Sequence, residues 1–267
     1  MRVPLFTSAG DPGSSFTDLL KMVGLDPFAV ADGVDGVVSA PHGTTVLALR
    51  YADGVVMAGD RRATMGTRIA NREMEKVVPA DRHSGVAISG TAGVAMDMIK
   101  LFQLQLEHYE KIDGRPISLE GKANQLSQMI KANLGAAMQG LAVIPIFAGY
   151  DVIRHTGRLW DFDITGGRYE EREFVATGSG GGPASTVLKV GYRPGQTADQ
   201  AIELACRALW EAAEVDSATG GPDLQRGIYP IVATISADGW KPVSEADLAS
   251  VFERLVSSQR DVRGASS

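Results

Sequence analysis

The chain has few residues that could form covalent or metal cross-links. Its 267 residues include one cysteine, Cys206, so no internal disulfide can form. Cys206 ends the apolar, helix-like stretch 201–206, which favours a packed thiol and suits the reducing cytosol. The four histidines have no i,i+4 pairing, which argues against a histidine metal site. These absences suit a cytoplasmic protein without a metal site, and we also expect no organic cofactor.

Long apolar runs and clusters of basic residues are also missing. No uninterrupted apolar stretch reaches the roughly 18 residues of a membrane-spanning helix. The start, 1–6, lacks the apolar core of about 7–15 residues that a secretory signal needs, so export is not expected. The formal charge of −6, without basic clusters, gives no electrostatic reason to expect nucleic acid or an anionic membrane as a partner.

The first 43 residues differ from the rest of the chain. They contain repeated glycine and proline and one short helix signal, between Phe16 and Val23, and cannot form a core alone. Two interpretations stay open: a disordered tail, or a propeptide that covers a nucleophile and is removed after Gly43. We expect a propeptide at 1–43, one compact domain at 44–257 and a polar tail at 258–267, with fraying expected over 261–267.

The domain itself combines strand and helix patterns. Two short apolar runs, 44–50 and 54–60, are joined by Tyr51-Ala52-Asp53-Gly54 as in a β-hairpin. Further strands are expected at 76–79, 85–89, 144–150, 158–163, 169–177 and 229–236. Apolar spacing predicts helices over 98–109, 119–134, 197–216 and from Ser244 onward. Together these patterns predict an α+β fold in which helices cover the outer faces of antiparallel sheets.

Three polar residues at the ends of these apolar runs suggest nucleophilic chemistry. If the Gly43–Thr44 bond were cut, Thr44 would carry a hydroxyl nucleophile and a free α-amine that can accept its proton. Lys76, paired with Asp60, would supply a positive charge that lowers the cost of forming the alkoxide. Taken singly, Asp60 is better explained as a turn residue and Lys76 as a solvated lysine. Taken together, they predict a nucleophile with its activating pair.

At these residues the sequence resembles the β-subunits of the 20S proteasome, most closely the actinobacterial type, over 39–257. The leader ends in His-Gly before Thr-Thr, and Asp60 and Lys76 lie sixteen and thirty-two residues after Thr44, as in that family. The resemblance implies a four-layer αββα sandwich of the N-terminal-nucleophile hydrolase type. It also implies a threonine endopeptidase that is activated by autocatalytic cleavage at Gly43–Thr44.

The resemblance further implies a set of partners that no motif in the chain reveals. They are proteasome α-subunits and other β-subunits, arranged as two stacked seven-membered β-rings between two α-rings. An ATPase ring would feed substrate, and the substrates would be unfolded or modifier-tagged proteins.

The resemblance assigns supporting residues around the nucleophile. It gives the N–H of Gly90 to the oxyanion hole, although the local sequence fits a simple turn glycine equally well. Ser179 and Asp216 match residues around the amine, and Thr219 stands where many members have serine, a departure that keeps the hydroxyl. Thr64 matches the residue whose backbone pairs with an extended substrate.

The family's primary specificity pocket corresponds to six positions. They are Ala63, Met74, Val78, Ile88, Ala92 and Met96. This lining is apolar and uncharged, which predicts cleavage after apolar residues. Several of these side chains fit a plain hydrophobic core as well.

Three other interpretations of the sequence compete with a threonine protease. Ser179 among glycines suggests a serine hydrolase, but the Gly-x-Ser-x-Gly pattern fails at Thr177. The glycine-rich 178–182 suggests a nucleotide site, but Pro183 replaces the third glycine of the dinucleotide fingerprint. A non-catalytic structural ring subunit of the same fold stays open, although the presence of all three predicted catalytic residues argues against it.

Overall fold

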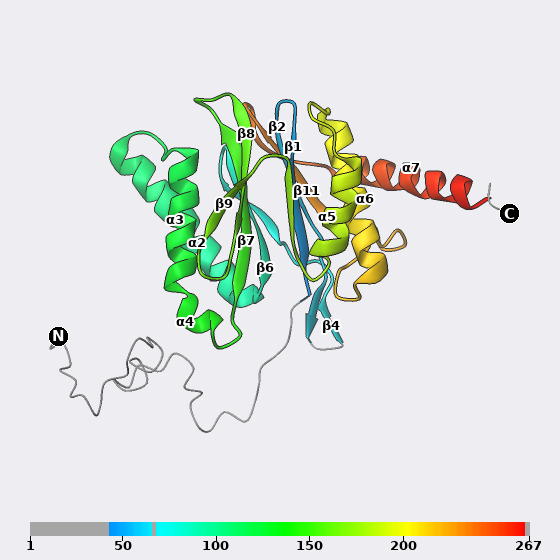
Figure 1. Cartoon of the computed structure of the whole chain (residues 1–267), viewed down its shortest axis with the longest axis horizontal. Helices are drawn as coiled ribbons and strands as arrows, with labels where there is room; N and C mark the ends of the chain where they lie inside the picture. The colour runs from blue at the N-terminus through cyan, green and yellow to red at the C-terminus, as the bar shows by residue number, and fades with distance from the viewer. Residues whose placement is uncertain (1–42, 66–67, 265–267) are drawn as a thin grey trace, which may run out of the picture. The chain divides into compact units, whose positions relative to one another are not determined.

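The computed structural model describes residues 43–65 and 68–264, with side chains up to residue 258 (Figure 1). The helix expected between Phe16 and Val23 and nearly all of the expected propeptide lie outside the described residues. Within the described ranges, no helix combines the length and the apolar character needed to cross a membrane.

Two five-stranded antiparallel sheets lie face to face, with a small separate hairpin beside them (Figure 1). The first sheet has the order β10-β1-β2-β11-β12, with β1 (Thr45–Tyr51), β2 (Gly54–Gly59), β10 (Phe174–Gly178), β11 (Ile231–Ser236) and β12 (Gly239–Pro242). The second has the order β5-β6-β7-β8-β9, with β5 (Val77–Asp81), β6 (Ser84–Gly90), β7 (Val143–Asp151), β8 (Thr156–Phe162) and β9 (Arg168–Glu171). The hairpin pairs β3 (Ala63–Met65) with β4 (Arg68–Asn71).

Helices cover the outer face of each sheet. The described helices are α2 (Ala92–Asp113), α3 (Leu119–Ala132), the short α4 (Leu134–Ala137), α5 (Gly181–Gly191), α6 (Ala198–Val215) and α7 (Glu245–Gly264). Buried side chains of α2 and α3 pack on the second sheet, and those of α5, α6 and α7 pack on the first. The order helix, sheet, sheet, helix confirms the predicted four-layer αββα sandwich.

Strand β1 illustrates how the sequence produces this layering. Successive side chains of a strand point to opposite faces, and both faces of β1 are covered. Leu47 and Leu49 pack against the helices, whereas Val46 and Ala48 pack between the two sheets. Because both faces are buried, the strand reads as a continuous apolar run rather than as an alternating one.

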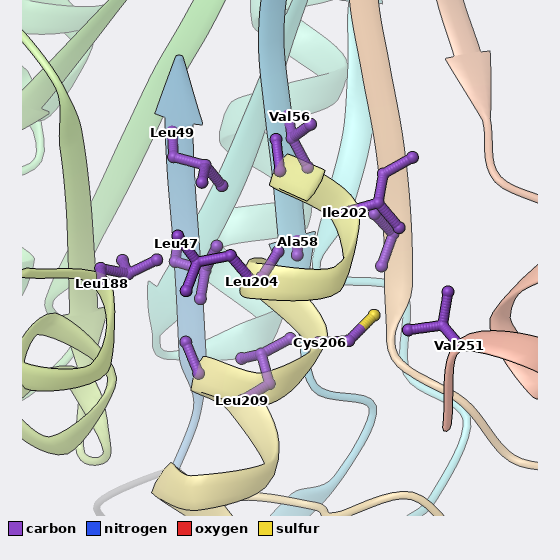
Figure 2. Close-up of a cluster of buried hydrophobic side chains, with 14 of the residues drawn as sticks. Leu47, Leu49, Val56, Ala58, Leu188, Ile202, Leu204, Cys206, Leu209 and Val251 are labelled. Atoms are coloured by element: carbon purple, nitrogen blue, oxygen red, sulfur yellow. The ribbon is translucent and has the colours of Figure 1, made fainter. Parts of the chain in front are cut away.

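Cys206 lies inside the helix-side cluster of the first sheet (Figure 2). The cluster joins Leu47 and Leu49 of β1 to Leu204 and Leu209 of α6. Cys206 is fully buried there, and this burial raises the pKa of its thiol to about 12. The prediction of a packed thiol is confirmed.

The segment expected as one strand over 169–177 is divided between two sheets. Its first part belongs to β9, which pairs with β8, and its second part belongs to β10, which pairs with β1. The single-strand prediction was wrong because pairing partners far away in sequence decide where the chain bends. The C-terminal helix also differs from expectation, since α7 continues to Gly264, beyond the boundary set at residue 257 and into the segment expected to fray.

Candidate active site

The predicted hairpin places Thr44 beside Asp60. Strands β1 and β2 pair with Tyr51 opposite Gly54 and Val46 opposite Gly59, so the residue before β1 lies near the residue after β2. The N–H of Asp60 donates to the carbonyl of Thr45 at 3.0 Å and closes this end of the ladder. The chain therefore brings the expected nucleophile and the expected carboxylate to one end of one sheet.

Asp60 is completely buried and both of its oxygens are fully used. Oδ1 accepts the N–H of Thr45 at 2.9 Å and Lys76 Nζ at 2.7 Å. Oδ2 accepts the N–H groups of Arg62 at 2.9 Å and Gly220 at 2.8 Å. A carboxylate has about four acceptor positions, and four donors occupy them here. This arrangement fixes the carboxylate far more firmly than an ordinary turn aspartate.

Lys76 is buried beside Asp60, with 1% of its surface exposed. Its Nζ donates to Asp60 Oδ1 at 2.7 Å and to the carbonyl of Arg62 at 2.5 Å, so two of its three N–H groups are engaged. Burial lowers the pKa of Lys76, and the Asp60 carboxylate opposes that effect. The ammonium is thus held in a fixed place and releases its proton more readily than a free lysine does.

Ser179, Asp216 and Thr219 form a second hydrogen-bonded group. The hydroxyls of Ser179 and Thr219 both donate to Asp216 Oδ2 at 2.5 Å, and the N–H of Ala218 donates to Oδ1 at 3.1 Å. Burial by itself would raise the pKa of Asp216, but these donors hold it below the usual value. The N–H of Ser179 donates to the carbonyl of Thr44 at 2.9 Å. The three predicted supporting residues therefore meet beside Thr44.

Gly43, on the leader side of the expected cleavage site, fits tightly against the domain. Its N–H donates to Thr64 Oγ1 at 3.2 Å. A Cβ added at Gly43 would lie 1.7 Å from the Cβ of Ala218, so a side chain at this position could not be accommodated without a shift of the loop. Glycine at this position has a steric reason, and Thr64 contacts the chain just before the expected cut.

Gly90 ends β6 with a positive φ of 105°, and an added Cβ would lie 2.2 Å from the carbonyl oxygen of Ala142. Only glycine fits this conformation and this close approach. The turn between β6 and α2 thus explains the glycine by itself, and the oxyanion role stays a prediction.

The predicted pocket residues occupy two settings. Val78 and Ile88 belong to the core cluster under α2, and Met74 and Met96 are partly buried against the same cluster. The remaining two, Ala63 in β3 and Ala92 at the start of α2, are also partly buried. Four of the six residues therefore belong to or border one apolar core cluster, and their role as a substrate pocket stays a prediction.

A cavity of about 520 Å³ lies beside the loop that carries Thr219. Its lining includes Arg61, Arg62, Arg72 and Gly220, and it shares none of the six predicted pocket residues. This arginine-lined cavity therefore does not coincide with the predicted apolar specificity pocket.

Thr45 is a site residue that the sequence reasoning missed. It is fully buried, and its hydroxyl contacts Thr219 Oγ1 at 2.6 Å and accepts the N–H of Gly180 at 3.0 Å. The available signal was a hydroxyl at the start of an otherwise apolar, buried strand. Its partners could not be found from the sequence because they lie 135 and 174 residues away.

Comparisons with known proteins agree on one family. A family model described as proteasome subunit matches residues 40–223. A proteasome subunit beta of Acidimicrobium ferrooxidans is 52% identical over 267 residues, covering 99% of this chain and 97% of that protein. Those of Jonesia denitrificans and Streptomyces griseus are 54% identical over 250 residues (91% of this chain, 82% of that protein) and 53% identical over 223 residues (84% and 79%). The chain belongs to the proteasome subunit family, as a β-subunit of the actinobacterial type.

Proposed function

We propose that this chain is a catalytic β-subunit, a threonine endopeptidase whose nucleophile is exposed by cleavage at Gly43–Thr44. The observation that supports the proposal best is the buried Lys76–Asp60 pair, because Asp60 Oδ1 also accepts the N–H of the residue that follows Thr44. A buried ion pair is costly to desolvate and is a weak contributor to stability, so a chemical role explains it better than a structural one.

In the proposed reaction, Thr44 Oγ1 attacks the carbonyl carbon of the scissile peptide bond. The α-amine of Thr44, with a reference pKa of about 7.7–8.0, takes the hydroxyl proton and passes it to the leaving amine. The remaining N–H of Lys76 stabilises the alkoxide, and the N–H of Gly90 donates to the oxyanion. Water activated by the same amine then cleaves the resulting ester and restores the hydroxyl.

Removal of the leader follows from the same nucleophile. Attack of Thr44 Oγ1 on the carbonyl of Gly43 converts the peptide bond into an ester and frees the α-amine, and water then cleaves the ester. The close fit of Gly43 against Ala218 supports this step, because it holds that carbonyl in a fixed position next to Thr44.

Assembly with other proteasome subunits follows from family membership. We further propose that the active site lies inside stacked seven-membered β-rings between α-rings, in the cytoplasm. An ATPase ring would deliver unfolded or modifier-tagged proteins. Sequestration is physically reasonable, because an exposed nucleophile would threaten other proteins.

Intact mass after co-expression with an α-subunit of an actinobacterial proteasome tests the proposal. We expect loss of residues 1–43 and a mature chain that begins at Thr44. Persistence of the full-length chain in an assembled particle would instead favour a non-catalytic ring subunit, and a different N-terminus would exclude Thr44 as the nucleophile.

The apolar lining of the predicted pocket leads to a specificity prediction. In a panel of fluorogenic peptides that differ only in the residue before the cut, kcat/KM is expected to be at least about tenfold higher after Leu or Phe than after Arg or Asp, since a charge in an apolar pocket is left unpaired. Equal or faster cleavage after a charged residue would refute the pocket assignment.

A further inference from the structure

Thr45 lies at the junction of the two hydrogen-bonded groups of the site. Its N–H donates to Asp60 Oδ1, the same oxygen that accepts Lys76 Nζ. Its hydroxyl contacts Thr219 Oγ1, and Thr219 in turn donates to Asp216. One residue therefore connects the ion pair on one side of Thr44 to the carboxylate group on the other.

The donors and acceptors along this path can be assigned. A threonine hydroxyl has one proton, and Thr219 gives its proton to the acceptor-only carboxylate of Asp216 at 2.5 Å. Thr219 must then accept at 2.6 Å from Thr45, whose own oxygen accepts the N–H of Gly180 at 3.0 Å. The hydrogen bonds run in one direction, from the Gly180 N–H through two hydroxyls to Asp216. Thr45 and Thr219 are both fully buried, where such chains are strengthened by mutual polarisation.

Gly180 lies directly against these two hydroxyls. An added Cβ at this position would lie 2.5 Å from Thr45 Oγ1 and 2.7 Å from Thr219 Oγ1. Gly180 immediately precedes α5, so the absence of a side chain lets the start of the helix approach the start of β1 closely. A side chain at position 180 would therefore displace the two hydroxyls.

We propose that Thr45 is a positioning residue, whose hydroxyl holds the start of β1, and with it Thr44, in register with the loop that carries Asp216. This inference rests on the proposed function. A valine at position 45 would keep the γ-methyl of Thr45, but it would lose the hydroxyl that completes the hydrogen-bonded path to Asp216. The expected consequence is an orientation effect on the chemical step and not on substrate binding, because Thr45 is too buried to contact substrate.

Four variants in the co-expressed particle separate the hydroxyl from the packing. Thr45→Val keeps the volume and loses the hydroxyl, while Thr45→Ser and Thr45→Ala both lose the methyl and differ only in the hydroxyl. Thr234→Val is the control in the same sheet, since within the described residues the half-buried Thr234 hydroxyl bonds to the carbonyl of Lys241 alone, at 3.4 Å. Turnover is expressed per mature chain, counted by intact mass, at a temperature well below unfolding.

We expect kcat of Thr45→Val to fall at least tenfold with KM changed less than twofold, and Thr45→Ser to keep kcat within about threefold of wild type. If Thr45→Val does not assemble, the same contrast between Thr45→Ser and Thr45→Ala carries the test. Wild-type kcat in Thr45→Val, or equal loss in Thr45→Ser and Thr45→Ala, would overturn the inference. A wild-type particle without peptidase activity would instead overturn the proposed function, so the two failures can be told apart.

Discussion

Thr44→Ala should abolish both peptide hydrolysis and removal of residues 1–43. The variant lacks the only atom that we propose attacks a carbonyl, in substrates and in the Gly43–Thr44 bond alike. Loss of an enzyme's nucleophile costs roughly 10⁴–10⁶ in kcat, so the remaining hydrolysis is expected at background. Fluorogenic peptide turnover and intact mass measure the two effects in the same sample.

Thr44→Ser is the matched control, because it keeps both the hydroxyl and, after cleavage, the α-amine. It should retain turnover and a mature N-terminus at position 44. The Thr44→Ala chain should still assemble, since the contact from the Ser179 N–H is made to the backbone carbonyl of residue 44 and not to its side chain. Appreciable turnover or a released leader in an assembled Thr44→Ala particle would rule out Thr44 as the nucleophile.

The sequence alone was enough to predict those parts of the site that two neighbouring strands bring together. Asp60 follows the strand that pairs with β1, and a two-residue turn sets the register, so its approach to Thr44 depends on local pattern alone. To predict the role of Lys76, the spacing typical of the family was needed. The local sequence does not show that this lysine is 1% exposed and paired with Asp60.

The rest of the site depends on long-range pairing, so the local pattern could not predict it: Ser179, Asp216 and Thr219 were named from the family resemblance, and Thr45 was not found. The strands of the second sheet lie between β1 and β10 in the sequence, yet β10 pairs with β1, and this pairing brings Gly180 to the hydroxyl of Thr45. The same pairing divides the run 169–177 between β9 and β10. The periodicity of that run gives its strand character but does not show which sheet each part joins.

Lys76→Met should lower kcat by at least about 100-fold, as expected when a fixed electrostatic donor is removed from an active site. Methionine fills most of the buried volume but carries no charge. The substitution also leaves Asp60 buried without its counter-ion, which costs about 3–5 kcal/mol of stability. Peptide turnover per assembled particle and the melting temperature report these two consequences separately.

Lys122→Met is a control for the loss of a buried lysine away from the proposed site. Lys122, on α3, is also buried, and its Nζ contacts the carboxylate of Asp81 at the end of β5. It lies in the helix layer that covers the outer face of the second sheet, and its ion-pair partner is not one of the predicted catalytic residues. We expect a smaller loss of melting temperature, because the side chain of Asp81 stays 21% exposed, and kcat within about twofold of wild type.

The double variant Asp60→Asn with Lys76→Met separates charge balance from chemistry. Asparagine removes the uncompensated charge, but its NH2 group must face at least one backbone N–H that Asp60 accepts, so only a small part of the lost melting temperature should return. Turnover should stay as low as in Lys76→Met, because no ammonium is present to stabilise the Thr44 alkoxide. If Lys76→Met keeps wild-type turnover, or if Lys122→Met loses as much turnover as Lys76→Met, then Lys76 acts only as a structural ion-pair partner and not in the reaction.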